Sequence, residues 1–155
     1  MRLNARMRQL IPEPRPRTWV LQAELAAVAE LGFTRREDCI IFSGQHGSQS
    51  NFPDSTGYEC FANHIHSDDF VSESSSGHLV EQALALAVSL NERLCKFSPN
   101  TAFRFIIAAN QDGCTLRFHV IRAGEQWETE DLALYSEEAV AVVDSDELLP
   151  APTAG

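Results

Sequence analysis

The sequence lacks most of the short patterns that identify an enzyme. It contains no G-x-S-x-G nucleophile turn, no P-loop and no G-x-G-x-x-G phosphate-binding loop, and it shows no internal repeat. Cys114 and His119 have opposite parity on one strand, so their side chains point to opposite faces and do not form a catalytic pair. The adjacent carboxylates, such as Asp68 and Asp69, point apart and resemble solvated charge. We therefore expect a non-enzymatic protein with no bound cofactor.

Closely spaced cysteines and long apolar runs are also missing. The four cysteines include no CxxC pair, and each lies in or beside an apolar run, which predicts reduced thiols rather than a disulfide framework. No apolar run approaches the roughly 18 residues of a membrane span, and the arginine-bearing start is not followed by the apolar core of a signal peptide. These absences predict a soluble, cytoplasmic protein that does not bind membranes.

Basic residues are few and unevenly placed. The chain has 12 Lys and Arg against 22 Asp and Glu, for a net charge of −10. Residues 1–17 carry five Arg and one Glu, whereas the chain from Glu125 onward carries nine acidic residues and no Lys or Arg. Such an acidic body repels nucleic acid and suits a basic protein partner. The alternative is that the charge serves solubility alone.

Length and composition predict one domain, because 155 residues with 44% hydrophobic side chains suffice for a core. We place this domain at residues 18–145. Residues 1–17 are expected to form a basic arm with a short helical or frayed start and then an extended stretch, since Pro12, Pro14 and Pro16 prevent a continuous helix. Residues 146–155 are expected to form a flexible acidic tail.

The clearest local pattern is a β-hairpin across residues 101–127. Apolar residues alternate with Arg and other side chains on both sides of Asp112-Gly113, a pair that favours a type I′ turn. If Gln111 pairs with Cys114, then Phe105 faces Val120 and the apolar faces coincide.

Weaker patterns predict the remaining elements. Thr18 is a candidate cap for a helix over 19–31, and serines before residue 78 are candidate caps for a strongly amphipathic helix over 78–96. The segment 43–57 is an unusually long loop, either functional or disordered. The other expected elements are an internal strand over 38–42, an edge strand over 58–65, a polar link over 67–77, a helical turn over 131–135 and a strand over 139–143.

Together these elements predict an α+β fold in the order α-β-β-α-β-β-β. An antiparallel sheet of about five strands would carry two helices on one face. The other face would hold Arg104, Arg117 and His119 and would be partly open to solvent.

One possible metal site precedes the second helix. Cys60, His64, His66 and Asp68 share parity on an extended backbone, but residues i and i+2 are about 6–7 Å apart, so the whole set spans too far for one ion. His64 and His66 with a third ligand from elsewhere remain an alternative zinc site. The preferred interpretation is that these are polar residues where an edge strand enters a loop, with no metal bound.

A candidate partner-binding surface follows the hairpin. It combines aromatic anchors with carboxylates, which supply affinity and electrostatic steering respectively. Its members are Glu125, Trp127, Glu128, Glu130, Asp131 and Tyr135. Alternatively, Trp127 and Tyr135 cap the edge of the core, an interpretation that we prefer for Trp127.

The region of about residues 100–145 resembles the small immunity proteins of bacterial toxin/immunity systems. The features concerned are Arg-Ala-Gly-Glu-Gln-Trp at 122–127, Asp131-Leu132, Tyr135 and the final Val-rich strand. This resemblance implies a cytosolic inhibitor that binds a cognate toxin domain and blocks or distorts its active site. The alternatives are an acidic secretion-type chaperone, which would be a homodimer, and a metal-dependent enzyme using His64 and His66. The oligomeric state stays open.

Overall fold

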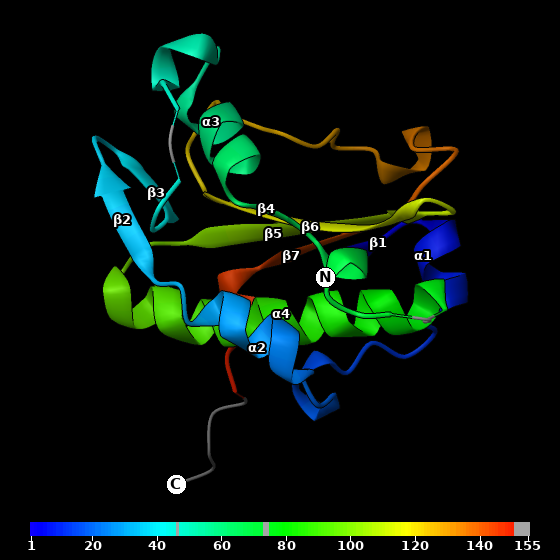
Figure 1. The fold of residues 1–155 in the computed structure, drawn as a ribbon. Helices are drawn as coiled ribbons and strands as arrows, with labels where there is room; N and C mark the ends of the chain where they lie inside the picture. Colours follow the sequence, from blue (N-terminus) through cyan, green and yellow to red (C-terminus); the bar gives the residue numbers. More distant parts are fainter. Residues whose placement is uncertain (46, 73–74, 151–155) are drawn as a thin grey trace, which may run out of the picture.

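A five-stranded antiparallel sheet packed on a long helix organises the computed structural model, which describes residues 1–45, 47–72 and 75–150 (Figure 1). The sheet has the strand order β1-β7-β5-β6-β4, and a separate hairpin consists of β2 and β3. The strands are β1 Arg2–Leu3, β2 Phe33–Arg36, β3 Cys39–Phe42, β4 His64–His66, β5 Phe103–Asn110, β6 Gly113–Val120 and β7 Ala139–Asp144. The α-helices are α1 Ala5–Leu10, α2 Ala23–Ala29, α3 Ser55–Ala62 and α4 Ser76–Phe97. Short 3₁₀ turns cover Pro16–Thr18, Gln49–Asn51, Ser67–Asp69, Leu132–Leu134 and Ser145–Leu148.

The expected α+β class and five-stranded antiparallel sheet are confirmed, but the expected pairing inside the β5-β6 hairpin was wrong. Asn110 pairs with Gly113 and Phe105 with Phe118, two positions away from the predicted register. The two-residue turn is therefore Gln111-Asp112, not Asp112-Gly113. Since strand side chains alternate with a period of two, the two-residue shift keeps every apolar side chain on its face. The hydrophobic pattern thus fixed the faces but not the partners.

Helix α4 carries the main core. Ser75 caps it by accepting a hydrogen bond from the backbone N–H of His78 at 3.2 Å, as the serines before the helix suggested. Its predicted apolar stripe is buried against the inner sheet face: Leu79, Ala83, Leu86, Leu90 and Leu94. Burying each leucine contributes about 1.5–3 kcal/mol. No helix in the described ranges is long and apolar enough to cross a membrane.

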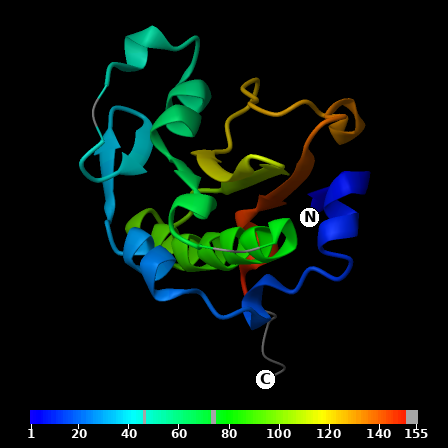
Figure 2. The same ribbon diagram turned by 45° about the vertical axis from the view of Figure 1, so that its right-hand side comes forward.

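The N-terminal residues belong to the folded core, which corrects the expectation of an arm outside the domain, although α1 agrees with the expected short helical start. Strand β1 pairs with β7, and α1 packs beside it (Figure 2). Asn4 caps α1 by accepting from the N–H of Met7 at 3.0 Å, and the same oxygen accepts from the N–H of Val140. Met7 and Ile11 are buried in the main core. The prolines begin only after α1, so they do not interrupt it.

The first residues of the expected flexible tail over 146–155 are ordered in the structure. Residues Ser145–Leu148 form a 3₁₀ turn, and Leu148 is buried in the main core. The predicted flexible tail continues through 151–155, which lie outside the described residues.

The first predicted helix was too long. It begins at Ala23 and ends at Ala29, instead of spanning 19–31. The cause is Gln82 on α4, whose side-chain amide donates to the carbonyl of Val20 at 2.8 Å and accepts from the N–H of Gln22 at 2.8 Å. These bonds satisfy the backbone outside a helix, so the segment before Ala23 stays extended.

The segment predicted as an edge strand over 58–65 is mostly helix α3, and only His64–His66 forms the edge strand β4. Asp54 caps α3 by accepting from the N–H of Gly57 at 2.7 Å. The alternation of Tyr58, Cys60 and Ala62 suggested a strand, yet Tyr58 and Ala62 are also spaced four apart, as on a helix face. The last three residues of the expected long loop over 43–57 therefore belong to α3, which begins at Ser55. Residue 46 within this segment lies outside the described residues.

Strand β3 is buried along its length, as predicted, but it is not internal to the main sheet. Its only strand partner in the described chain is β2, which the sequence pattern did not reveal. Side chains of α3 and of its C-terminal cap residue accept hydrogen bonds from backbone N–H groups on the other edge of β3. Glu59 accepts from the N–H of Ile40 at 2.7 Å, and Asn63 accepts from the N–H of Phe42 at 3.0 Å. A helix therefore replaces the missing strand.

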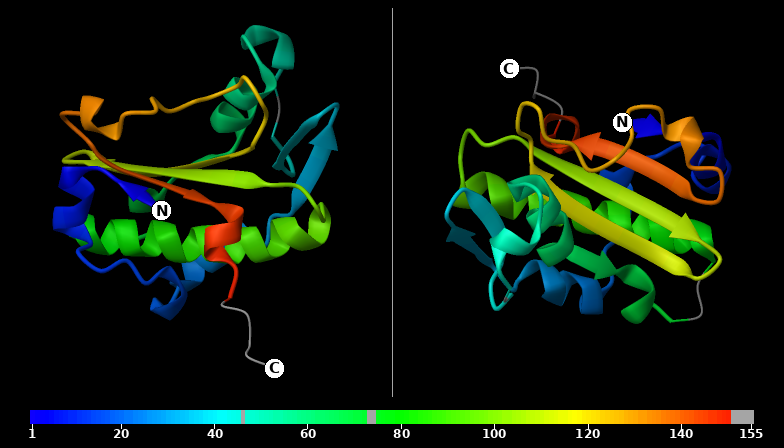
Figure 3. Two further views of the ribbon diagram at one scale, coloured as in Figure 1. Left: turned by 180° about the vertical axis from the view of Figure 1, so that it is seen from behind. Right: turned by 90° about the horizontal axis from the view of Figure 1, so that it is seen from above.

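The described residues form four α-helices where two were expected, and part of the outer sheet face is covered (Figure 3). Residues 121–138, here called the connector, cross this face between β6 and β7, and α3 lies over its other part. Leu132 and Tyr135 of the connector pack on Ile106, Val140 and Val142. His119 is buried on this face, whereas Arg104 and Arg117 are partly exposed, so the face is partly open to solvent as expected.

Candidate functional site

Glu128 fixes the connector to the sheet. Its Oε1 accepts hydrogen bonds from Arg2 at 3.0 Å and from Arg104 at 3.1 Å. Arg104 also binds both carboxylate oxygens of Asp144 on β7, at 2.7 and 3.0 Å. This bond to Asp144 raises the pKa of Arg104, with the nearby Glu128 adding to the effect. Glu128 is 3% exposed, so it supports the predicted surface from beneath and is not itself available to a partner.

Glu125 performs a similar structural task at the start of the connector. Its carboxylate accepts a hydrogen bond from the backbone N–H of Thr56 at 3.1 Å, in the first turn of α3. A carboxylate is favourable there because the first N–H groups of a helix have no partner within the helix. Glu125 is half-buried, and it ties the connector to α3.

Trp127 and Tyr135 exchange the roles expected for them. Trp127, which we expected to cap the core edge, is 45% exposed and lies under the guanidinium of Arg117, whose Cζ is 5.1 Å from the ring centroid. Tyr135 instead packs on the apolar side chains of the outer sheet face, such as Ile106 and Val140. Its hydroxyl accepts a hydrogen bond from the N–H of Thr129 at 3.0 Å. Trp127 is therefore the available aromatic anchor.

Glu130 and Asp131 lie at the exposed turn of the connector. The side chain of Asp131 accepts from the N–H of Ala133 at 3.0 Å and caps the 3₁₀ turn, while the backbone carbonyl of Glu130 accepts from Arg2 at 3.1 Å. Leu134 on this turn is 70% exposed. The carboxylate of Glu130 and the side chain of Leu134 are thus displayed on a backbone held from below.

A hollow of about 340 Å³ lies between the connector and the outer sheet face. Ile106, Ala108 and Val140 contribute apolar lining, and Arg117, Trp127, Tyr135 and Glu138 add polar and aromatic side chains. Burial lowers the pKa of Arg117, whose Nη1 donates to the carbonyl of Cys60 at 2.9 Å. Strand alternation placed Arg117 on the outer face, but its contact with Trp127 depends on where the connector crosses.

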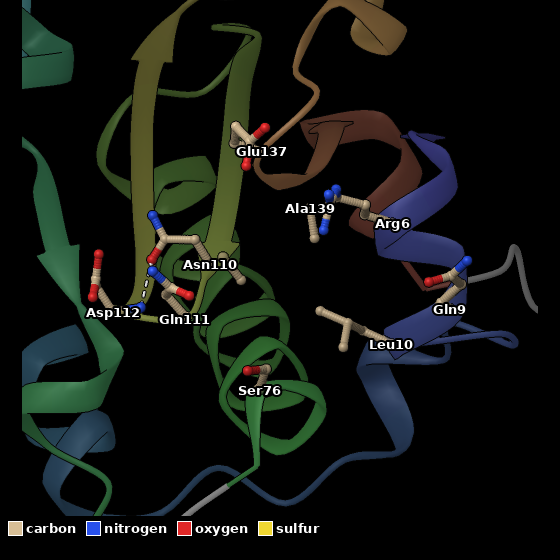
Figure 4. A pocket seen from close by; sticks show the side chains of 10 residues that line it. Arg6, Gln9, Leu10, Ser76, Asn110, Gln111, Asp112, Glu137 and Ala139 are labelled. Atoms are coloured by element: carbon tan, nitrogen blue, oxygen red, sulfur yellow. Dashed lines mark hydrogen bonds between the residues drawn. The ribbon is translucent and has the colours of Figure 1, made fainter.

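A second hollow, of about 530 Å³, lies between α1, the β5-β6 turn and the start of α4 (Figure 4). Arg6, Gln9, Asn110, Asp112 and Glu137 contribute polar side chains to its lining, and Leu10, Ala109 and Ala139 contribute apolar ones. Asn110 accepts from the N–H of Asp112 at 2.8 Å, which ties the turn to its own strand. None of the six predicted surface residues lines this hollow.

The two candidate metal ligands are adjacent in space. The Nε2 atoms of His64 and His66 are 3.2 Å apart on β4. Cys60 is buried in α3, and Asp68 accepts from the N–H of Cys114 at 2.9 Å, so neither joins them. Within the described residues, no group of three or more His, Cys, Asp or Glu side chains is arranged to hold a metal.

Cys39 on β3 and Cys114 and His119 on β6 are buried titratable side chains. Burial raises the pKa of Cys39 and of Cys114 to about 11, which keeps both thiols protonated at neutral pH. Cys114 lies in the main core, whereas His119 lies under the connector, so their predicted opposite orientation is confirmed. His119 donates from Nδ1 to the carbonyl of Val120 at 2.7 Å, and burial lowers its pKa.

Comparison with known proteins assigns the family. The family model described as the Uncharacterized protein PM0498 family matches residues 2–152. The chain belongs to this family. The matched range of the PM0498 family spans every described strand and helix, including β1 and the turn at Ser145–Leu148. No curated protein and no solved structure matches the chain.

Proposed function

We propose that the protein is a non-enzymatic binding module, an immunity-type inhibitor that holds a basic toxin domain through the connector. The observation that carries this proposal is the contrast within the connector. Glu128 is buried and fixed by two arginines, while Glu130, Asp131 and Glu137 are exposed on the same connector as the exposed side chains of Trp127 and Leu134. A rigid base with an exposed aromatic and surrounding carboxylates is suited to bind a cationic surface.

The pre-formed connector reduces the cost of binding. Its two ends are tied by Arg122 to Glu59 and by Asn4 to the carbonyl of Glu138, the latter at 2.8 Å. A segment that is already ordered loses less conformational entropy when a partner binds. Trp127 then supplies contact area, and the exposed carboxylates steer the approach of a basic partner.

The test is titration of the purified protein with the toxin domain encoded beside it. We expect a dissociation constant in the nanomolar class and an association rate that falls about tenfold or more as salt rises from low to several hundred millimolar. Binding that ignores salt, or the absence of binding, contradicts the proposal. Light scattering adds an independent check, because the alternative secretion-type chaperone requires a homodimer.

A further inference from the structure

His64 and His66 form a pair whose geometry was set by the fold. They occupy positions i and i+2 of β4, opposite Arg117 and Thr115 of β6, while Ile65 between them points into the main core. Both imidazoles therefore lie on the outer side of the sheet. Their ring centroids are 5.0 Å apart with an interplanar angle of 78°, and the two Nε2 atoms approach to 3.2 Å.

The other ring nitrogens are already engaged. Nδ1 of His64 donates to the carbonyl of Phe61 at 3.0 Å, which leaves Nε2 of the neutral ring unprotonated, 3.2 Å from Nε2 of His66. Nδ1 of His66 lies 3.5 Å from the hydroxyl oxygen of Thr115. Metal-binding histidines usually use one nitrogen for the metal and donate from the other to a carbonyl or similar acceptor. The contact between His64 and Phe61 reproduces this arrangement.

The separation of the two nitrogens fits one shared ion. Transition-metal bonds to histidine are about 2.0–2.1 Å long, so two nitrogens bound to one ion at about 90–110° are about 2.9–3.4 Å apart. The observed 3.2 Å falls within this interval. We propose that His64 and His66 chelate one divalent transition-metal ion of the class that prefers imidazole, such as Ni²⁺, Cu²⁺ or Zn²⁺.

This site differs from the zinc enzyme considered from the sequence. The described residues supply two protein ligands and no third, so water would complete the coordination. Thr115 contacts His66 and also lines the hollow beneath the connector, so the ion would lie next to that hollow. The proposal does not depend on the protein-binding function and implies no reaction.

Ni²⁺ is the preferred probe, because imidazole suits it and thiolates compete less than for Zn²⁺ or Cu⁺. Chelator-treated protein would be titrated with Ni²⁺ by calorimetry. We expect one ion per chain with micromolar-class affinity, and a rise in melting temperature with added Ni²⁺. His64→Ala and His66→Ala should each weaken binding about tenfold or more, since each removes one of two protein ligands.

His78→Ala is the matched control, because His78 is a partly exposed histidine on α4 and should leave Ni²⁺ affinity unchanged. Circular dichroism establishes that each variant is folded. A Cu²⁺ electron paramagnetic resonance spectrum should show two nitrogen donors in the wild type and one in either variant. Equal Ni²⁺ affinities for the wild type and both variants would overturn the proposal. The short distance between the two rings would then be explained by an N–H···N hydrogen bond.

Discussion

Arg122 of the connector and Glu59 of α3 form an ion pair at 2.5 Å that joins four parts of the fold. Besides Arg122, Glu59 accepts from the N–H groups of Ile40 on β3 and Val120 on β6, at 2.7 and 3.0 Å. Arg122 also donates to the carbonyl of Asp38 at 2.9 Å, before β3. One fully buried carboxylate thus holds the separate hairpin, α3, the sheet and the connector together.

Removing this carboxylate should be strongly destabilising. Glu59→Ala leaves Arg122 without its buried partner and two backbone N–H groups without acceptors, which should lower the free energy of unfolding by about 3–5 kcal/mol. Urea unfolding measures this change. The control is Glu13→Gln, whose exposed pair with Arg15 should contribute about 0–1 kcal/mol. Equal losses in the two variants would contradict the joining role of Glu59.

The first residue of β6, Gly113, should not tolerate a side chain. Gly113 has φ of +151°, and a Cβ there would clash with Oδ1 of Asp68. Gly113→Ala should therefore lower the free energy of unfolding by about 2 kcal/mol or more, measured by urea denaturation. Gly124→Ala is the control, because its φ of +78° is also positive but nothing lies within 4 Å, so a loss of about 1 kcal/mol is expected. If both variants lose the same amount, crowding by Asp68 is not the cause.

Stability should fall in mild acid because of His119. Burial holds its pKa below the ordinary value near 6.5, so below about pH 6.5 the unfolded chain binds more protons than the folded one. The free energy of unfolding is then highest above this pH. It decreases as pH falls, by at most about 1.4 kcal/mol for each pH unit, because a single proton is involved. Urea unfolding of the wild type and His119→Gln at pH 7.5 and 5.5 tests this. The variant should lose less stability between the two pH values, and identical losses would contradict the assignment.

Two sets of carboxylates in the connector should separate stability from binding. Glu128→Gln weakens the buried bridge between Arg2 and Arg104, so it should lower the free energy of unfolding by about 2–4 kcal/mol. The double variant Glu130→Gln, Asp131→Asn should change stability by about 1 kcal/mol or less, yet slow association with a basic toxin domain several-fold at low salt.

A charge-matched control distinguishes local steering from net charge. Glu24→Gln with Glu30→Gln removes two exposed carboxylates from α2 and its C-terminal cap, on the side of the sheet opposite the connector. Stopped-flow association should be affected much less by this pair. Equal slowing by both double variants would indicate that only the total charge of the protein matters.

The sequence by itself determined those helices and strands whose pattern of apolar residues matches the face that is buried in the structure. The stripe of α4 and the alternation of β5 and β6 each direct one apolar face into the main core, so their period revealed both the element and its orientation. It did not determine the hairpin partners, because a two-residue slip preserves parity. It indicated a short helical start within residues 1–17, but not that Asn4 caps α1 or that Met7 anchors this helix in the main core.

Tertiary structure decided the features on which the candidate sites depend. Residues 58–62 form a helix and not a strand because of their contact with β3. The N–H groups on the free edge of β3 need acceptors, and a helix presents Glu59 and Asn63 to that edge together. Which connector carboxylates are buried depended on Arg2 and Arg104, which are more than 20 residues distant in sequence from Glu128. Contacts between distant residues leave no periodic signal in the chain, and only the packed structure brings them together.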